Sequence, residues 1–572
     1  MEALCSLLSA LSLGLSLFGT ACRCGGPDPW DGPVLTEPRT QLTVDDLSSD
    51  GTFALMDMSF FGRPAWAADS TAPFSGSVTF AEAALLSDGA RTLYEGEGLF
   101  PALTIELIRH DQELIPRAKG VIDPQGGSDR YWDVILGVGA VWQEEGDAGW
   151  SRASLPVQLL GRYVGEVRNC VATFAYTEDD ISSTYLQCSQ ETAVLDAGQV
   201  SNMRAMVATT YEPHDLDDVV GFLDQHEASM ARRIPTASLS AIDADHEIAD
   251  HFCCSKVTGA STSLGAVSLD GTLYVAPPKT RHGTYPYPDE MRQGVFSVTK
   301  SMAGALAMFY FAERYGEEIF DEPIADHVPA FAGLPEWQGV TFAHALNMVT
   351  GTRAGEDLLY EPLELAPDKE TAITNIAQFG DFPEAPGEVF NYATTNTFVL
   401  SYALEQYVKQ REGEEVHYWD LVRDNVLTPI GAENFDLLYT RDEDPAERIP
   451  ILGLGAFPSL DEAAKIASLI ANEGEHEGRQ LLNRAKIREA LGRTEWEGHK
   501  AFSGLRYRHS FWADSIRAGG CKVEIVYMEG LGDNRIIFFP SGATSFQFTD
   551  EFDGQIKRLV RAVEGIQSSC DP

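Results

Sequence analysis

Positive charge is scarce in this sequence of 572 residues. It has 42 Lys and Arg residues against 86 Asp and Glu residues, which gives a formal net charge of −44. Proteins hold nucleic acids mainly through Lys and Arg on the phosphates, so this balance argues against a nucleic-acid partner. It argues equally against docking on anionic lipid through a basic patch.

Several chemical motifs are also missing. The nine cysteines include no Cys-x-x-Cys pair, which argues against a zinc ribbon. No Gly-x-Ser-x-Gly elbow and no Walker or dinucleotide-binding motif is present. Residues 243–251 carry Asp and His at helical spacing and could bind a metal, but we interpret them as a solvated polar face. We therefore expect neither a metal nor a cofactor.

The first 40 residues look like an export signal and a tether. An apolar run ends in Gly19-Thr-Ala-Cys22, which predicts a signal peptide over residues 1–21 and lipidation at Cys22. Gly19, and the lack of Lys or Arg before the run, depart from the usual lipoprotein pattern. Residues 22–40 are Gly- and Pro-rich and predict a linker. We expect a protein of the bacterial periplasm or cell envelope, attached to a membrane through an N-terminal lipid only.

The remaining chain is too long for one ordinary core and divides into two regions. Residues 41–212 contain short β-branched and aromatic runs, as at 104–109, 133–138 and 170–176, and predict a β-rich accessory domain of unknown role. A β-sandwich is its simplest arrangement. Cys170 and Cys188 flank a turn and could face each other across two strands, whereas the pairing of the other cysteines stays open.

Residues 213–572 combine strands at both ends with helices between them. This order predicts an α+β fold, in which helices flank one antiparallel sheet that sequence-distant segments close, with a helical lobe inserted. The elements that we expect are a helix at 215–224, a hairpin at 266–275 with an Asp-Gly turn, a helix after Ser297, strands at 523–527 and 535–539, and a helix at 550–564.

The motif that carries chemistry is Ser297-Val-Thr-Lys300. Residues three apart on a helix share a face, so the Ser297 hydroxyl and the Lys300 amine can meet. Only one of the 11 lysines has a serine three residues before it, which argues against chance. A serine needs a base to take its proton, and a lysine whose pKa is lowered by apolar surroundings can be that base. The motif predicts a covalent nucleophile.

Four further segments follow this motif in a recognisable order. They are residues 320–331, residues 340–351, residues 386–400 with Tyr392, and residues 427–431. Together with Ser297 and Lys300 they resemble the β-lactamase-like serine hydrolases, a family of class C β-lactamases, D-amino-acid peptidases, esterases and nylon-oligomer (6-aminohexanoate-dimer) hydrolases. The resemblance covers residues 262–565 and implies the β-lactamase/transpeptidase-like fold, with Ser297, Lys300 and Tyr392 as catalytic residues.

Two segments depart from the commonest family pattern. Where many family members have Tyr-Ser-Asn, this sequence has Tyr392-Ala-Thr394. Where they have a Lys-Thr-Gly or His-x-Gly box, Met528 stands at the first position. The second departure resembles the nylon-oligomer hydrolases, in which a Gly-Ile-x-Gly-Gln run lines the site. The resemblance implies substrate-binding roles for four residues: Thr394, Gly530, Leu531 and Asn534.

We therefore expect an exported serine hydrolase that acts on a small amide, peptide or ester through an acyl-enzyme. Neutral Lys300 and Tyr392 would take the Ser297 proton, and the N–H groups of Ser297 and Leu531 would hold the oxyanion. The alternative is a non-catalytic envelope protein that keeps the fold as a binding module. Thr394 and Met528 favour this alternative, whereas the intact Ser297, Lys300 and Tyr392 favour the enzyme.

Overall fold

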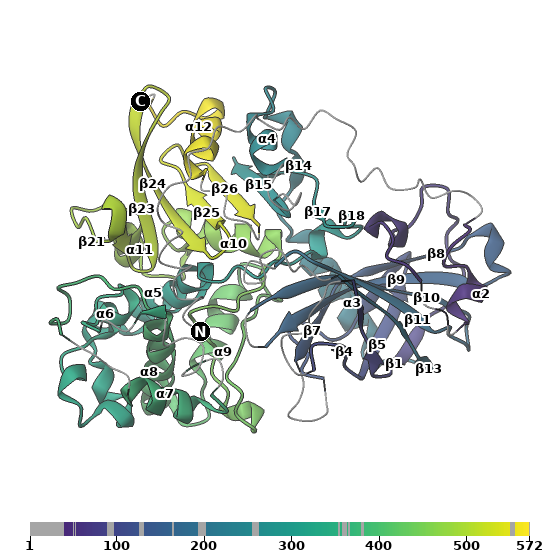
Figure 1. The fold of residues 1–572 in the computed structure, drawn as a ribbon, viewed down its shortest axis with the longest axis horizontal. Coiled ribbons are helices and arrows are strands. Elements are labelled where there is room, and N and C mark those ends of the chain that lie inside the picture. The colour runs from purple at the N-terminus through teal and green to yellow at the C-terminus, as the bar shows by residue number, and fades with distance from the viewer. Residues whose placement is uncertain are drawn as a thin grey trace.

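In the computed structural model the chain forms a β-barrel followed by a mixed C-terminal domain (Figure 1). The structure describes residues 39–570 apart from 50, 52, 89–95, 125–130, 163–164, 193–201, 254–261, 353–354, 357–362, 364–365, 379–382 and 550–554. The predicted signal peptide, Cys22 and nearly all of the predicted linker lie outside the described residues. None of the described helices has the length and apolar content needed to span a membrane.

The barrel arises because one antiparallel sheet closes on itself. Only Ala208 separates β12 (Met203–Val207) from β13 (Thr209–Pro213), so the two form one extended segment. Its β12 part pairs with β11, and its β13 part pairs with β1. Counted as one strand, β12–β13 completes a ring of eight strands among the described residues. The ring comprises β1 (Ser75–Phe80), β5 (Leu103–His110), β6 (Glu113–Pro116), β8 (Gly139–Trp142), β9 (Ser151–Gly161), β10 (Val167–Tyr176), β11 (Thr184–Gln190), β12 (Met203–Val207) and β13 (Thr209–Pro213).

Side chains fill the barrel. Along β10, Cys170, Phe174 and Tyr176 belong to the interior core, whereas Val167 and Val171 belong to a core shared with the C-terminal domain. Eight strands enclose just enough room for such packing. The predicted β-rich region and its strands are confirmed, but the β-sandwich is wrong, because a strand's own pattern does not reveal where the sheet's ends meet. The additional strands are β2 (Ala83–Ala84), β3 (Leu86–Ser87), β4 (Leu99–Phe100) and β7 (Trp132–Leu136).

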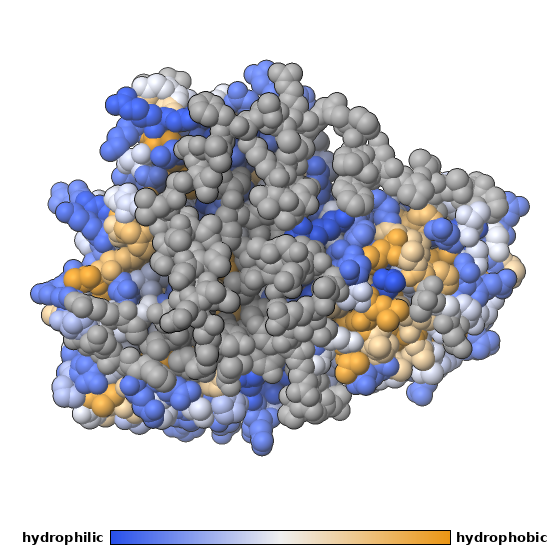
Figure 2. All heavy atoms as spheres, viewed as in Figure 1, coloured by the Kyte–Doolittle hydropathy of each residue, from blue (hydrophilic) through white to orange (hydrophobic). Residues whose placement is uncertain are grey.

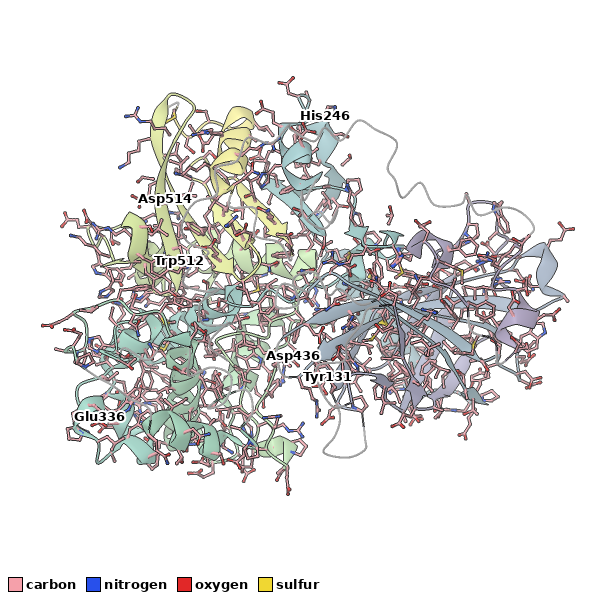
Figure 3. The ribbon with its side chains drawn as sticks, in the orientation of Figure 1. Tyr131, His246, Glu336, Asp436, Trp512 and Asp514 are labelled. Atoms are coloured by element: carbon pink, nitrogen blue, oxygen red, sulfur yellow. A yellow bond between two sulfur atoms is a disulfide. The ribbon has the colours of Figure 1, made fainter. Side chains whose placement is uncertain are left out.

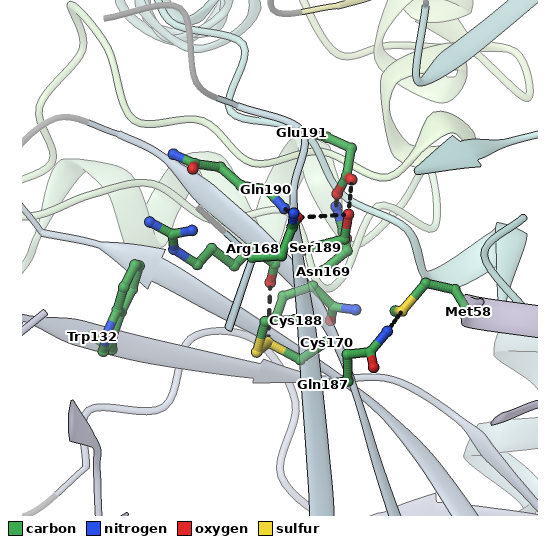
Figure 4. The surroundings of a disulfide bond; sticks show 12 residues. Met58, Trp132, Arg168, Asn169, Cys170, Gln187, Cys188, Ser189, Gln190 and Glu191 are labelled. Atoms are coloured by element: carbon green, nitrogen blue, oxygen red, sulfur yellow. Dashed lines mark hydrogen bonds between the residues drawn. A yellow bond between two sulfur atoms is a disulfide. The ribbon is translucent and has the colours of Figure 1, made fainter. Parts of the chain in front are cut away.

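Two disulfides join distant parts of the chain. Cys170 of β10 and Cys188 of β11 occupy paired register positions, as the sequence allowed, and form a cross-strand disulfide (Figure 4). Cys521 at the start of β24 is bonded to Cys570 near the C-terminus, a pairing that the spacing left open. Both bonds are consistent with an oxidising compartment.

The C-terminal domain is built on an open sheet. Its strand order is β14-β16-β15-β26-β25-β24-β23-β22-β21, in which β14 is parallel to β16 and the other pairs are antiparallel. The early β15 pairs with the late β26, which confirms the predicted closure by distant segments. The bounds are β14 (Thr236–Ser238), β15 (Leu264–Leu269), β16 (Thr272–Val275), β21 (His499–Lys500), β22 (Arg506–Arg508), β23 (Phe511–Ala518), β24 (Cys521–Gly530), β25 (Asn534–Phe538) and β26 (Thr544–Phe548).

Local sequence explains several of these elements. Asp270 and Gly271 both have positive φ in the two-residue turn between β15 and β16, as a twisted hairpin requires. The first predicted helix begins later than expected, because Asp218 is left-handed and α3 starts at Val219. The last predicted helix is confirmed as α12 (Ile556–Ile566), and residues 550–554 lie outside the described part of the chain.

Helices cover both faces of the open sheet. Apolar residues of α12 pack with those of α4 on one face, and α5, α8 and α10 contribute to the shared core on the other. The bounds are α3 (Val219–Ala231), α4 (Glu247–Cys253), α5 (Leu306–Tyr315), α6 (Phe342–Leu346), α7 (Lys369–Gln378), α8 (Thr394–Glu412), α9 (Tyr418–Val422), α10 (Leu460–Ala471) and α11 (Arg484–Ala490). A short helix, α2 (Val44–Leu47), and the two-residue strands β17 (Lys279–Thr280), β18 (Gly283–Thr284), β19 (Glu475–His476) and β20 (Arg479–Gln480) complete the fold.

The barrel and the C-terminal domain share one hydrophobic core. Leu160, Val167 and Val171 of the barrel belong to the same apolar cluster as Leu306 of α5. Ion pairs Arg448–Asp123 (2.8 Å) and Lys119–Glu433 (3.3 Å) also cross the junction, where Figure 3 labels Tyr131 and Asp436. On the face drawn in Figure 2, apolar residues gather over the barrel, and hydrophilic residues surround them.

Candidate active site

Ser297 lies at the start of a helical segment that ends at Tyr315. The residue before it, Phe296, has a left-handed backbone (φ 45°), which is costly for a non-glycine residue and is found at functional sites. Residues Lys300–Ala305 form a π-helix before α5 begins. The helix was predicted, but its widened first part was not, because helix-forming composition does not distinguish α from π turns. Such turns are frequent at functional sites.

Lys300 is completely buried, and its hydrogen bonds within the described part of the chain go to uncharged oxygens. Its Nζ lies 2.7 Å from Ser297 Oγ, 2.8 Å from Thr394 Oγ1 and 2.8 Å from the Gly453 carbonyl oxygen. Burial lowers the pKa of Lys300 to about 8, and the negative charge of Glu356 opposes this decrease. A substantial fraction of the amine is therefore neutral at mildly alkaline pH.

The three contacts fix how a neutral Lys300 would be oriented. A neutral amine has two N–H donors and one lone pair. The Gly453 carbonyl oxygen can only accept, so one N–H is committed to it, and the second N–H is available to Thr394 Oγ1. The lone pair then faces Ser297 Oγ, which is the arrangement that a general base requires.

Tyr392 joins Ser297 and Lys300 from a separate segment just before α8. Its ring centroid lies 4.9 Å from Lys300 Nζ, and Ser297 lies near enough to its hydroxyl to favour the phenolate form. Burial, followed by the charges of neighbouring groups, raises the pKa of Tyr392 well above its usual value. The phenol therefore keeps its proton at neutral pH, so it can donate a proton while Lys300 accepts one.

Aromatic packing holds Tyr392 in place. Its ring stacks on Trp512 of β23, which is labelled in Figure 3, with centroids 5.8 Å apart. Trp512 in turn contacts Phe390 and Phe502, and Phe502 is 58% exposed. The catalytic phenol is therefore the inner end of an aromatic cluster that reaches the surface.

The end of β24 lies directly against the nucleophile turn. A Cβ built on Gly530 would be 2.0 Å from the Val295 carbonyl oxygen and 3.1 Å from Ser297 N, so only glycine fits there. β23 pairs with β24 only as far as Tyr527, and residues 528–530 pair with β25 alone. One side of this strand end therefore has backbone groups that are free of strand pairing beside Ser297.

The other residues predicted for this strand are placed differently. Leu531 follows Gly530 in the turn and is half-buried. Asn534 is completely buried: its amide donates to the Leu531 carbonyl at 2.7 Å and accepts from Thr549 N at 3.0 Å. Asn534 thus holds the β24–β25 turn, and its role toward substrate stays a prediction. Met528 is completely buried in the shared core.

Two groups at the site were missed from the sequence. The Gly453 carbonyl accepts from Lys300, and a Cβ on Gly453 would meet Thr394 Cγ2 at 2.4 Å. Glu356 Oε1 accepts from Thr394 N at 2.9 Å and from Thr394 Oγ1 at 3.0 Å. No short motif marks either residue. Glu356 follows the Thr350-Gly351 match by five residues, and that position is the only hint in the sequence.

The barrel supports the backbone that leads to Ser297. Asn169 of β10 bonds to both sides of Arg292, donating to its carbonyl at 2.8 Å and accepting from its N–H at 2.9 Å. Gln293 donates to the Glu191 carbonyl, and Gly294 N donates to Thr192 Oγ1. Each of residues 292–294, shortly before the nucleophile, is thus tied to the barrel, and Figure 4 shows Asn169 and Glu191 beside the disulfide.

The Asp and His residues near α4 form a helix cap. Asp243 accepts backbone N–H bonds from Ile248 at 3.2 Å and Ala249 at 2.7 Å, and His251 contacts Gln547 at 3.2 Å. Within the described part of the chain, no group of His, Cys, Asp and Glu side chains has the geometry of a metal site.

Residues 223–496 match the Beta-lactamase family model. A search of curated proteins finds no match. Among solved structures, a protein named as a 6-aminohexanoate-dimer hydrolase from Bacillus anthracis is 16% identical, with 58% of this chain and 87% of that chain covered and a TM-score of 0.43.

Two further structures cover similar parts of the chain. A penicillin-binding protein homologue from Caulobacter crescentus is 16% identical, covers 58% of this chain and 98% of its own, and has a TM-score of 0.43. The D-amino acid amidase from Ochrobactrum anthropi is 14% identical, covers 57% and 97%, and has a TM-score of 0.41. Residues 223–496, in the C-terminal part of this chain, thus match the β-lactamase family and have its fold.

Proposed function

We propose that the protein is an exported serine hydrolase that cleaves a small amide, peptide or ester through an acyl-enzyme. The observation that carries this proposal is the 2.7 Å contact between Ser297 Oγ and the buried Lys300 Nζ, with the Tyr392 ring centroid 4.9 Å from the same amine. A serine, a base and a proton donor in mutual contact are the components of nucleophilic acyl transfer.

The reaction would begin when Lys300 takes the Ser297 proton as Oγ attacks the substrate carbonyl. The carbonyl oxygen becomes negative and would rest on the Ser297 N–H and on an N–H from the β24 end, for which Leu531 is our candidate. Tyr392 would give its phenol proton to the leaving group, since its raised pKa keeps the phenol protonated, and would regain a proton from water after that group departs. Water activated by Lys300 would then hydrolyse the ester on Ser297.

Two observations bear on export. The disulfides Cys170–Cys188 and Cys521–Cys570 suit a compartment that keeps thiols oxidised. The apolar N-terminus and Cys22 support passage to the periplasm or envelope, with lipid attachment at Cys22. Mass spectrometry of the mature protein would test this part, because an N-terminus other than a lipid-bearing Cys22 contradicts lipidation.

A non-catalytic envelope protein remains the competing function. Thr394 stands where many family members have an amide, and Met528 stands where they have Lys or His, so a binding role without turnover would explain both departures. The geometry favours the enzyme, because a pure binding protein has no need to keep a lysine buried without a carboxylate partner.

The deciding experiment is covalent labelling. A fluorophosphonate probe should add once to the intact protein, and peptide mapping should place the adduct on Ser297. Ser297→Ala should abolish labelling, whereas Ser240→Ala, at an exposed serine of the same domain, should leave it unchanged. A panel of p-nitrophenyl esters, amino-acid amides and D-peptides should then identify the substrate class. Absence of any adduct with wild-type protein between about pH 6 and 9 would refute the enzyme.

A further inference from the structure

Glu356 completes a hydrogen-bonded chain that begins at the nucleophile. The chain runs from Ser297 Oγ to Lys300 Nζ (2.7 Å), to Thr394 Oγ1 (2.8 Å) and to Glu356 Oε1 (3.0 Å). Lys300 has no acceptor capacity when protonated, and a carboxylate cannot donate, so the Thr394 hydroxyl must accept from Lys300 and donate to Glu356. The direction of every bond in the chain is therefore determined.

Burial differs along this chain. Lys300 is fully buried and Thr394 is 3% exposed, whereas Glu356 is only half-buried. A second bond, from Thr394 N to Glu356 Oε1 at 2.9 Å, holds the carboxylate beside α8. Of Lys300, Thr394 and Glu356, only Glu356 is thus partly exposed to water.

The acyl-enzyme removes the proton route through Ser297. Once Ser297 carries an acyl group, its Oγ has no hydrogen and cannot carry a proton to or from Lys300. The Gly453 carbonyl can only accept. Of the three groups that hydrogen-bond to Lys300, only Thr394 can then both receive and release a proton.

We propose that Glu356, acting through Thr394, is a positioning residue that orients Lys300 toward Ser297 and carries protons between this buried amine and water. This inference rests on the proposed hydrolase function. It also gives Thr394 a definite task, since a hydroxyl at this position can relay a proton in either direction.

The proton transfer balances without any other reactant. The Lys300 ammonium gives one N–H proton to Thr394 Oγ1 while the Thr394 O–H proton moves to the Glu356 carboxylate. Lys300 is left neutral, Thr394 is unchanged, and the Glu356 carboxylic acid releases its proton to water. No covalent bond other than N–H and O–H forms or breaks.

The charged and titratable groups around Lys300 define the expected pH response. Glu356 and Tyr392 face the amine together with Ser297, and Tyr507 and Glu529 act on Tyr392. Glu356 supplies the negative charge that favours the ammonium form of Lys300. Glu356→Gln removes this charge and keeps an oxygen that can accept from Thr394, so the acid limb of activity should move to lower pH.

Two measurements test the proposal. The first is the rate of fluorophosphonate labelling of Ser297 between pH 5 and 9, which requires no knowledge of the natural substrate. The second is the burst and steady-state release of p-nitrophenol from p-nitrophenyl acetate, with the acyl-enzyme followed by intact mass. Glu388→Gln, an exposed carboxylate before Tyr392, makes the same change in net charge and serves as the matched control.

The expected results separate positioning from simple structural support. Glu356→Gln and Thr394→Val should each lower steady-state turnover about 10- to 100-fold, the loss expected for a hydrogen bond to a charged group, and should accumulate acyl-enzyme. Thr394→Ser keeps the hydroxyl and should stay within about threefold of wild type. Only Glu356→Gln should shift the acid limb of labelling to lower pH.

Contrary results are equally clear. If Glu356→Gln has the same pH profile and burst as wild type and as Glu388→Gln, Glu356 has no role in the reaction and the inference fails while the hydrolase function stands. Wild-type protein that takes no label overturns both. If Glu356→Gln does not fold, as judged by its melting curve, equal turnover of Thr394→Val and Thr394→Ser overturns the relay.

Discussion

The two sheets of this molecule differ in how completely their backbone groups are paired. In the barrel, β12–β13 closes the ring, so each ring strand lies between two others. The C-terminal sheet is open, and residues 528–530 of β24 extend past the end of β23. This unpaired strand end lies beside Ser297. The proposed active site therefore lies where the pairing of a sheet is incomplete, and the complete sheet supports the backbone that leads to it.

Lys300 differs in its partners from the buried cations of the barrel and from others of its own domain, such as Arg292, which is paired with Glu462 at 2.8 Å. In the barrel, Arg152 is paired with Asp147 at 2.7 Å and Arg39 with Glu144 at 2.8 Å, so each buried cation has a carboxylate partner. Lys300 has only hydroxyl and carbonyl oxygens as hydrogen-bond partners. A carboxylate partner favours the charged form of a buried lysine, whereas burial without one lowers its pKa.

Among substitutions that test this difference between the two sheets, we expect the largest loss of activity at Gly530. A Cβ in Gly530→Ala would meet the Val295 carbonyl at 2.0 Å and push the strand end away from Ser297. We expect kcat/KM on a p-nitrophenyl ester to fall about 10²- to 10³-fold, as when an oxyanion donor is lost. Gly304→Ala is the control, because its Cβ would find the nearest atom at 3.8 Å. Equal activity of the two variants would contradict our placement of the oxyanion site.

The pH dependence of kcat/KM should reflect the titration of Lys300. Lys300 acts as a base only when neutral, and its pKa is about 8, so kcat/KM should rise with pH and level off above this value. Below it, activity should fall about tenfold per pH unit, as expected for loss of one essential proton acceptor. Stopped assays of p-nitrophenyl acetate hydrolysis between pH 6 and 9 would measure this limb. A profile that is flat over the range argues that Lys300 is not the base.

A smaller effect on labelling is expected from a substitution in the barrel. Asn169→Ala removes the bonds to the Arg292 N–H and carbonyl and leaves both buried, which should cost about 1–3 kcal/mol in the free energy of unfolding. The same variant should label more slowly with the fluorophosphonate, although Asn169 has no contact with the catalytic residues. Thr79→Ala, on the barrel's solvent face, is the control for both urea unfolding and labelling. Normal labelling of a destabilised Asn169→Ala would show that the barrel supports stability alone.

Much of the C-terminal domain could be predicted because its signals are local or ordered. Ser297 and Lys300 share a helical face, Asp270-Gly271 determines a hairpin, and the ordered segments pointed to Tyr392. Glu356 and Gly453 could not be predicted, since each reaches Lys300 only through the tertiary fold. The closed barrel was missed for a similar reason: pairing of β1 with β13 joins residues that lie more than a hundred positions apart, and strand patterns carry no information on partners.

The pairing of early with late segments has a consequence for synthesis. The barrel can close as soon as residue 213 has left the ribosome, because β13 is the last strand that it needs. The second sheet must wait for residues 544–548, the partners of β15. Pairings of such high contact order form slowly. The barrel can therefore be complete before β26 pairs with β15, and the segment that carries Ser297 can settle on an already folded surface.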